Sequence, residues 1–417
     1  MHILYDFLIR IAMAFMWLGQ FFSKKLKLFV SGRKGVFEVI ASKIGDDDQT
    51  IWIHCASLGE FEQGVPVLKA IRKKLPQFKI VVSFFSPSGY EIKKNSSLAD
   101  VVVYLPLDTK QNAKQFINTV HPSLVLFVKY EFWPNYLFEL KNRNIHTILI
   151  SGVFRKDQIF FKPHGGFMRK ALGCFDHYFV QDFDSEELLK KLNIKNITVA
   201  GDTRFDRVSQ QIEQDNRLDF IEEFKQNSLC IVCGSTWPED EAVLLDSFNL
   251  ASEHVKFIIA PHKMDGDKIK ELQKKLRPKT ILYSKKEGKN LSQYSILIVD
   301  TIGLLTKIYS YADIAYVGGA MGNTGLHNIL EPATFEVPIL IGKNYDRFSE
   351  AKHLRRLAGL FAVTNKNECS QIIKKLVEDN DYRTKTGMIC GHYIKSNTGA
   401  TQKTMDYILN LYDNSRS

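Results

Sequence analysis

Two series of short, continuously apolar segments alternate with helix-like segments along this chain of 417 residues, and this alternation is what most constrains its fold. The first series comprises residues 51–57, 79–85, 101–106, 124–129, 146–151 and 178–181. The second comprises residues 229–235, 255–261, 296–300, 314–319 and 337–342. Continuous apolar strands separated by helices are typical of parallel sheets covered on both faces. The sequence therefore predicts two doubly wound α/β domains.

The break between the two series gives the predicted domain boundaries. Residues 202–226 are polar and charged and carry no strand signal. We expect a linker at residues 206–226, between a first Rossmann-like domain (residues 31–205) and a second one (residues 227–410) that faces it across a cleft. We expect residues 1–30, which are apolar and then basic, to form a membrane-associated N-terminal helix.

Charge and cysteine usage narrow the class of protein. The net charge of +10 favours anionic partners, but the basic residues form no long run, which argues against a nucleic-acid-binding arm. The six cysteines have no disulfide-framework spacing, which indicates a reducing compartment. Cys230 and Cys233 form a C-x-x-C on a predicted buried strand, and no second cysteine or histidine pair completes a zinc site.

The N-terminus predicts association with a membrane surface. Residues 11–22 are apolar except for Gln20, a run shorter than the roughly 20 residues that cross a bilayer. The positive charges follow this run, at Lys24, Lys25, Lys27, Arg33 and Lys34, so the segment does not have the form of a signal peptide. A helix lying in the interface, with lysines against anionic lipid, fits best. A buried first helix of a globular domain and a tilted single span remain as alternatives.

Ligands of open parallel sheets bind beyond the carboxyl ends of the strands, so the loops there hold the candidate site residues. Glu60 follows the first strand in a Ser57-Leu58-Gly59-Glu60 turn, where a carboxylate can accept a proton from a sugar hydroxyl. The same residue can instead serve only to offset a helix dipole. Glu131 lies in a charged, aromatic loop after the fourth strand, ahead of Pro134 at a predicted helix start.

The second domain has loops suited to a nucleotide. Ser235 and Thr236 follow its first strand and can offer hydroxyls and backbone N–H groups to a phosphate. The glycine-rich segment 318–325 permits close approach of a ligand, and Asn328 and Glu331 share one face of the helix expected next. A dinucleotide-binding G-x-G-x-x-G interpretation fails, because no acidic residue follows a neighbouring strand at the right distance. The pattern favours a nucleotide-sugar donor site.

Five segments, in order, closely resemble the 3-deoxy-D-manno-octulosonic acid (Kdo) transferases of lipopolysaccharide synthesis, and the resemblance covers roughly residues 20–400. The segments are Ser57–Glu60, Tyr130–Asn135, Gly201–Asp206, Gly234–Thr236 and His327–Ala333. The resemblance implies the two-domain GT-B fold and inverting, metal-independent transfer of Kdo from CMP-Kdo to lipid IVA at the cytoplasmic face of the inner membrane. It implies that Glu60 is the general base and that Glu131 and Arg155 lie on the acceptor side. It implies CMP binding by Pro261, His262, Ile302, Gly303, Leu304, Asn328, Ile329, Leu330 and Glu331.

The chain departs from the family's pattern on the donor side. Pro261-His262-Lys263 stands where the family usually has Pro-Arg-His, so Lys263, with Ser235 and Thr236, is the candidate for contacting the donor phosphate. Trp237 stands where a histidine is common. Two other functions remain open: another GT-B enzyme that uses a UDP-sugar, or a membrane-surface binding protein without turnover.

Overall fold

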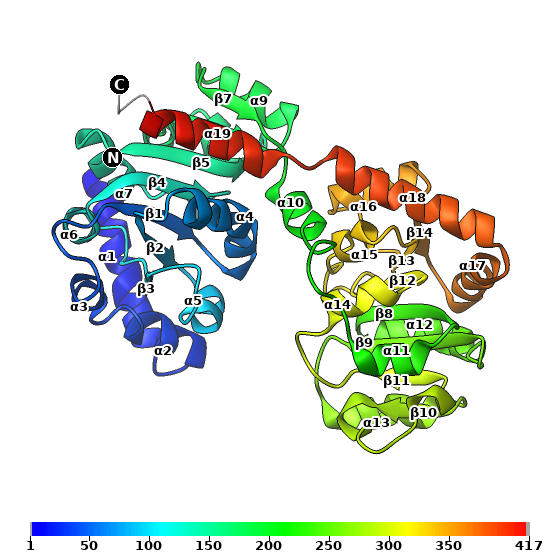
Figure 1. The fold of residues 1–417 in the computed structure, drawn as a ribbon. Helices are drawn as coiled ribbons and strands as arrows, with labels where there is room; N and C mark the ends of the chain where they lie inside the picture. The colour runs from blue at the N-terminus through cyan, green and yellow to red at the C-terminus, as the bar shows by residue number, and fades with distance from the viewer. Residues whose placement is uncertain (1, 414–417) are drawn as a thin grey trace. The chain divides into compact units, whose positions relative to one another are not determined.

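The computed structural model describes residues 2–413 and divides the chain into two compact units. Unit 1 comprises Met1–Arg207 and Thr398–Ser417, and unit 2 comprises Val208–Asn397. Each unit is built on one seven-stranded sheet whose strand pairs are all parallel, with helices on both faces (Figure 1). The predicted α/β class, with two doubly wound sheets, is confirmed.

The sheet of unit 1 has the strand order β3-β2-β1-β4-β5-β6-β7. Its strands are β1 (Thr50–Cys55), β2 (Lys79–Phe84), β3 (Val101–Tyr104), β4 (Pro122–Val128), β5 (His146–Gly152), β6 (His177–Val180) and β7 (Ile197–Val199). Its helices are α1 (His2–Gly19), α2 (Lys24–Ser31), α3 (Val36–Ala41), α4 (Leu58–Lys74), α5 (Pro87–Lys93), α6 (Lys110–Val120), α7 (Pro134–Asn142), η1 (Ile159–Phe161), α8 (Gly166–Leu172), α9 (Phe183–Lys190), α10 (Thr203–Ser209, which runs across the boundary) and α19 (Ala400–Asp413).

The sheet of unit 2 has the order β10-β11-β9-β8-β12-β13-β14. Its strands are β8 (Leu229–Thr236), β9 (Val255–Pro261), β10 (Thr280–Leu282), β11 (Ile296–Ile298), β12 (Ile314–Val317), β13 (Ile339–Gly342) and β14 (Leu360–Val363). Its helices are α11 (Asp219–Lys225), α12 (Pro238–Phe248), α13 (Gly266–Lys275), η2 (Tyr283–Lys285), η3 (Leu291–Gln293), α14 (Leu305–Ile308), η4 (Tyr309–Tyr311), α15 (Leu330–Thr334), α16 (Ser349–Arg356), α17 (Lys366–Glu378) and α18 (Asn380–Ser396).

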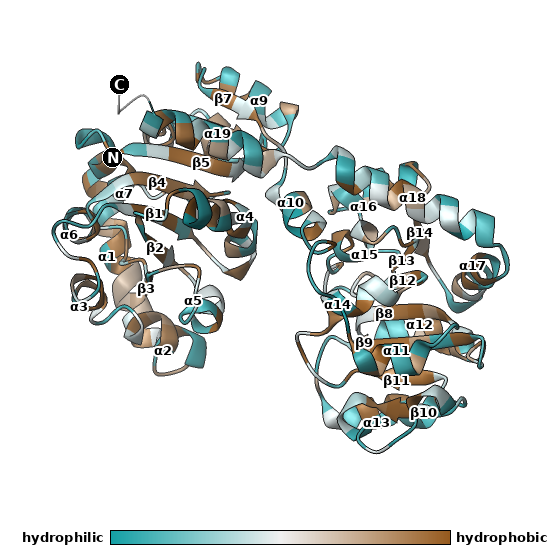
Figure 2. Cartoon of the chain, viewed as in Figure 1, coloured by the Kyte–Doolittle hydropathy of each residue, from teal (hydrophilic) through white to brown (hydrophobic). Residues whose placement is uncertain are grey.

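Burial on both faces explains why the strands are apolar without alternation. In β1, Ile51 and Ile53 pack into one core cluster of unit 1, whereas Trp52 packs into the cluster on the other face. Figure 2 shows the strands of both sheets in brown, while the outer helix α18 is largely teal and white. A strand covered on both faces has no polar side, which is the pattern that the sequence shows.

Three strands were missed from the sequence, and all three are at sheet edges: β7, β10 and β14. Each contains three or four residues and pairs with one neighbour only. An edge strand is less buried, so its sequence is less apolar; the burial of β7, for instance, is intermediate throughout.

The predicted domain boundaries differ from the structure at two places. The expected linker, residues 206–226, contains helix α11, whose Ile221 and Phe224 are buried in unit 2. These two apolar residues are three positions apart in a charged segment, a spacing that indicates one buried face of a helix. The predicted second domain ran to residue 410, whereas helix α19 returns to unit 1, where Met405 and Ile408 join a core cluster with residues of α4.

The N-terminal segment is two helices, and no residue of α1 is buried. By length and composition, α1 is the one helix within residues 2–413 that could span a membrane. Its first turns are nevertheless attached to unit 1, because Tyr5 Oη donates to Asp108 Oδ2 (2.7 Å) and His2 Nε2 lies 2.6 Å from Asn135 Oδ1. Farther along, Phe15, Trp17, Phe21 and Phe22 are exposed.

Candidate active site

The first group of candidate residues lies at the switch point of the unit 1 sheet. Strands β1 and β4 are parallel neighbours, and the strand order runs in opposite directions on either side of them. The loops that leave the carboxyl ends of two such strands diverge and leave a crevice. The Glu60 loop follows β1 and the Glu131 loop follows β4, so the structure brings together two of the motifs predicted as functional.

Glu60 lies in the first turn of α4, which begins at Leu58 after Ser57. Its side chain is half-buried, and Ser57 Oγ donates a hydrogen bond to its Oε2. Within residues 2–413, no hydrogen bond to Oε1 is recorded, so that oxygen can accept a proton. A carboxylate in the first helical turn also interacts favourably with the helix dipole. An interaction of Glu60 with the helix dipole is therefore compatible with a role as proton acceptor.

Glu131 is held by a chain of hydrogen bonds that reaches into the core. Trp133 Nε1 donates to Glu131 Oε2 (2.8 Å), and His54 Nε2 lies 3.3 Å from the same oxygen. His54 is fully buried on β1, and its Nδ1 lies 2.8 Å from Ser83 Oγ on β2. The Ser83 hydroxyl in turn accepts a hydrogen bond from Trp52 Nε1 (2.8 Å). Side chains of the two strands β1 and β2, together with Trp133, thus fix the orientation of one carboxylate.

The loop that carries Glu131 ends at a firmly anchored helix start. Pro134 occupies the first turn of α7, where its missing N–H costs nothing. Asp108 accepts hydrogen bonds from the backbone N–H groups of Asn135 and Tyr136, both at 3.1 Å, and from the Tyr5 hydroxyl. Burial raises the pKa of Asp108 to about 6. One buried carboxyl group therefore joins α1 to the loop of the candidate site.

Arg155 comes from the loop after β5 and meets the Glu131 loop. Its Nη2 donates to Tyr130 Oη at 3.1 Å, and its guanidinium carbon lies 5.6 Å from the centre of the Tyr130 ring. Its side chain is otherwise exposed. The structure thus places the predicted acceptor-side residues Glu131 and Arg155 on neighbouring loops.

In unit 2 the switch point lies between β8 and β12. Ser235 lies near the end of β8 and has a left-handed backbone (φ 54°), a conformation that is uncommon for non-glycine residues. Gly318 packs so closely on this turn that a Cβ atom would lie 2.3 Å from Ser235 O. The buried Asp240 accepts hydrogen bonds from Trp237 N (2.9 Å) and Gly319 N (2.8 Å), which ties the turn to the glycine-rich loop.

Trp237, His262 and His327 form an aromatic stack beside this turn. The Trp237 and His262 rings are 4.7 Å apart at an interplanar angle of 22°, and His262 and His327 are 4.3 Å apart. Trp237 Nε1 donates to His327 Nε2 (3.1 Å), which requires a neutral His327. Burial lowers the pKa of His327 to about 4, in agreement with that requirement. The tryptophan that departs from the family pattern therefore has a defined structural role.

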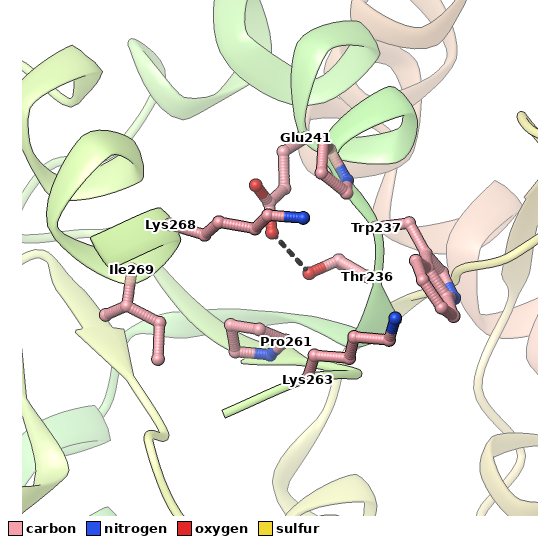
Figure 3. A pocket seen from close by; sticks show the side chains of 8 residues that line it. Thr236, Trp237, Glu241, Pro261, Lys263, Lys268 and Ile269 are labelled. Carbon is pink, nitrogen blue, oxygen red and sulfur yellow. Dashed lines mark hydrogen bonds between the residues drawn. The ribbon is translucent and has the colours of Figure 1, made fainter. Parts of the chain in front are cut away.

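A pocket next to the stack contains three of the predicted donor-side residues (Figure 3). Thr236, Pro261 and Lys263 line it together with Trp237, Pro238, Glu241, Lys268 and Ile269. Lys263 Nζ lies 4.9 Å from the Trp237 ring, and Thr236 Oγ1 donates to Glu241 Oε1 (3.0 Å). Lys268 was not predicted, because it lies inside helix α13 and away from any strand end.

The remaining predicted CMP contacts meet around Glu331. Its carboxylate accepts hydrogen bonds from Asn328 Nδ2 (3.0 Å) and Thr306 Oγ1 (3.2 Å). Thr306 belongs to α14, directly after Ile302, Gly303 and Leu304, so this loop and the Asn-x-x-Glu motif are adjacent. Ile302 is 81% exposed, and Gly303 has a left-handed backbone (φ 90°).

Two details of that motif differ from the prediction. Helix α15 begins at Leu330, so Asn328 lies before the helix rather than on one of its faces. The side chains of Ile329 and Leu330 are buried in the core, which leaves only their backbone groups for a ligand.

The structure has the two doubly wound sheets of the GT-B fold. One sheet has a carboxylate at its switch point, and the other has a glycine-rich loop and lysines near its own. Solved structures share this fold. The UDP-GlcNAc 2-epimerase of Neisseria meningitidis bound to UDP-GlcNAc matches with a TM-score of 0.61 at 15% identity, over 87% of this chain and 100% of that one. A glycosyltransferase from Rickettsia africae matches with a TM-score of 0.56 at 15% identity, over 87% and 98%.

Sequence comparison then shows which family the chain resembles. The model of the family described as 3-deoxy-D-manno-octulosonic-acid transferase (kdotransferase) matches residues 31–207. The 3-deoxy-D-manno-octulosonic acid transferases of Haemophilus influenzae and Chlamydophila psittaci are each 27% identical to this chain, over 86% and 80% of it and over 86% and 78% of their own lengths. The chain is thus related to the Kdo transferases over most of its length, as its motifs predicted.

One relative is longer. The bifunctional glycosyltransferase/methyltransferase of Fusobacterium nucleatum is 27% identical over 87% of this chain, but the match spans only 57% of that protein.

Proposed function

We propose that this protein transfers Kdo from CMP-Kdo to lipid IVA, with inversion at the anomeric carbon and with Glu60 as the general base. The observation that carries the proposal is the position of Glu60, in the first turn of α4 at the switch point of a sheet whose family match covers residues 31–207. A carboxylate held there by Ser57, with one oxygen open, suits removal of a proton from a sugar hydroxyl.

The reaction is a single displacement. The oxygen of an acceptor hydroxyl forms a bond to the anomeric carbon of Kdo, its proton passes to the Glu60 carboxylate, and the bond to CMP breaks on the opposite side. Glu131, oriented by His54 and Trp133, positions the acceptor. Because its carboxylate is fixed in advance, it needs no reorganisation during the reaction.

CMP-Kdo binds to unit 2 in this proposal. The Trp237–His262 stack and the Asn328–Glu331 segment bind the nucleoside. The two ribose hydroxyls can donate hydrogen bonds to the Glu331 carboxylate. Lys263 and Lys268, both at the pocket of Figure 3, are the cations for the donor phosphate. With two lysines and a strand-to-helix turn at this position, we propose that the leaving group departs without a metal ion.

The proposed location is the cytoplasmic face of the inner membrane. The exposed aromatic residues at the end of α1 and the lysines that begin α2 suit a surface of anionic lipid, where a lipid acceptor resides.

Mass spectrometry of the lipid product tests this function. Purified full-length protein is incubated with CMP-Kdo and lipid IVA, and the expected products carry the mass of one or more added Kdo residues. A parallel melting experiment compares CMP with UDP. Stabilisation by UDP and not by CMP would indicate an enzyme that uses a UDP-sugar. An unchanged lipid with no release of CMP would indicate a binding protein without turnover.

A further inference from the structure

Three cationic side chains come from segments at the carboxyl edge of the unit 1 sheet, the edge that also carries Glu60. Lys129 follows β4, Arg155 follows β5, and Arg204 lies in the first turn of α10. We propose that Lys129, Arg155 and Arg204 form a binding site for an oxyanion of the substrates, a carboxylate or a phosphate. The proposal deepens the proposed function and rests on it for the identity of the ligand.

Tyr130 connects two of the three cations. Lys129 Nζ lies 5.1 Å from the centre of the Tyr130 ring, and the guanidinium carbon of Arg155 lies 5.6 Å from the same centre. The Tyr130 hydroxyl accepts a hydrogen bond from Arg155 Nη2 (3.1 Å). One aromatic ring therefore holds two like charges near each other, an arrangement that costs energy until an anion is bound.

The third cation is placed by the Gly201–Asp206 motif. Arg204 Nε donates to Asp202 Oδ2 (2.7 Å), and the neighbouring Thr203 donates its hydroxyl to Gln63 O (2.6 Å) on α4, one turn after Glu60. The hydroxyls of Ser151 and Thr203 lie 2.9 Å apart, which ties the motif to the end of β5 as well. The motif thus sits between the two elements that carry Glu60 and Arg155.

Lys129 is the least satisfied member of the group. Its side chain is half-buried, and within residues 2–413 no carboxylate lies within ion-pair distance of its Nζ. Burial lowers the pKa of Lys129, and Arg204 and Arg155 lower it further, while Glu60 and Asp202 act in the opposite direction.

The backbone at Lys129 is also costly. Its φ of 72° is left-handed, a conformation that favours glycine, although its N–H still bonds to Ile150 O (2.9 Å). Strain of this kind persists where the surrounding structure imposes it and is concentrated at ligand sites. A half-buried lysine that is kept in such a conformation, near two arginines and without an ion pair within residues 2–413, is suited to receive an anion.

The proposed function supplies two sources of such an oxyanion: the carboxylate of the sugar acid and the phosphates of the lipid acceptor. The two differ in chemistry, so small probes separate them. Free Kdo represents the first, glucosamine 1-phosphate represents the second, and glucosamine serves as the probe without an acidic group.

The test measures binding of each probe to the full-length protein by isothermal titration or by melting, with Lys129→Met and Arg155→Gln as variants. Lys114→Met is the matched control, because it removes the same charge from an exposed position on α6. Lys129→Met keeps a side chain of similar volume. Arg155 is exposed, so we expect Arg155→Gln to leave the fold unchanged.

We expect one of the two anionic probes to bind wild type and Lys114→Met equally and to bind Lys129→Met or Arg155→Gln about 10- to 100-fold more weakly, the range for a hydrogen bond to a charged group. The anionic probe whose binding is weakened by these substitutions identifies the source of the oxyanion. Equal binding by wild type and both variants, or binding of glucosamine as tight as that of the anions, would overturn the proposal. The measurement needs no transfer reaction, so failure of Kdo transfer and failure of this site are distinguishable.

Discussion

Asp206 connects the C-terminal helix to unit 1, and its replacement gives a sharp prediction. In the sequence it is the last residue of the Gly201–Asp206 segment. In the structure it is 8% exposed and accepts three hydrogen bonds from the start of α19: Gly399 N (2.6 Å), Thr401 N (2.7 Å) and Thr401 Oγ1 (2.7 Å). It therefore holds the C-terminal helix on unit 1.

The magnitude follows from those contacts. A hydrogen bond to a charged group contributes about 1.5–3 kcal/mol. The three bonds share one carboxylate and are not additive, so we expect Asp206→Ala to lower the free energy of unfolding of unit 1 by about 3–5 kcal/mol, as for other broken buried charge networks. Release of α19 also withdraws Met405 and Ile408 from the core.

Hydrogen–deuterium exchange and urea unfolding measure the effect. Asp206→Ala should raise the exchange rates of the α19 amides well before global unfolding, and it should shift the urea midpoint of unit 1 downward. Asp406→Ala, on the exposed face of the same helix, is the control and should change stability by no more than about 0.5 kcal/mol. If Asp206→Ala behaved like this control, the reasoning from these contacts would be wrong.

Three further predictions follow from the structure. Trp237→Ala should weaken CMP binding about tenfold and Trp237→Phe by less, measured by titration calorimetry, because an aromatic pair contributes roughly 0.5–1.5 kcal/mol beyond its buried area; equal affinities would remove the stack from the donor site. The native state holds His327 neutral with a pKa near 4, below its unfolded value, so the stability it contributes is present above pH 6.5 and is lost as pH falls toward 4. The melting temperature should therefore drop between pH 7 and pH 5 by less in His327→Gln than in wild type, and an identical drop would contradict the assignment. Phe21→Ser with Phe22→Ser should reduce sedimentation with vesicles of anionic lipid by at least tenfold, since each buried phenylalanine contributes about 1.5–3 kcal/mol; Phe183→Ser, an exposed phenylalanine of α9, should leave it unchanged.

The central strands and the loops that follow them could be predicted from the sequence because burial on both faces leaves a strong local pattern. The predicted strand at residues 51–57, observed as β1 (Thr50–Cys55), is an example. Trp52 faces a different core from Ile51 and Ile53, and the Ser57–Glu60 turn follows the strand. Which loops converge depends on strand order, which no local pattern encodes. The position of Glu131 opposite Glu60 follows from the pairing of β1 with β4.

Other features depend on contacts between residues far apart in the chain. His54 reads as one more residue of an apolar strand, and only the structure shows it beside Glu131 and Ser83. The return of α19 to unit 1 depends on Asp206, 195 positions before Thr401. Lys129 stood at the end of a strand in the sequence, but its left-handed backbone and its neighbours Arg155 and Arg204 are properties of the fold.

The role of Glu60 as general base is the central claim, and the rate of Kdo transfer by Glu60→Gln tests it most directly. The control is Glu62→Gln, which changes the same group two residues away, where Lys93 and Arg207 pair with it. Circular dichroism checks that both variants are folded. We then expect kcat to fall by roughly two to four orders of magnitude in Glu60→Gln and by far less in Glu62→Gln. Transfer by Glu60→Gln at a rate close to that of wild type would contradict the account.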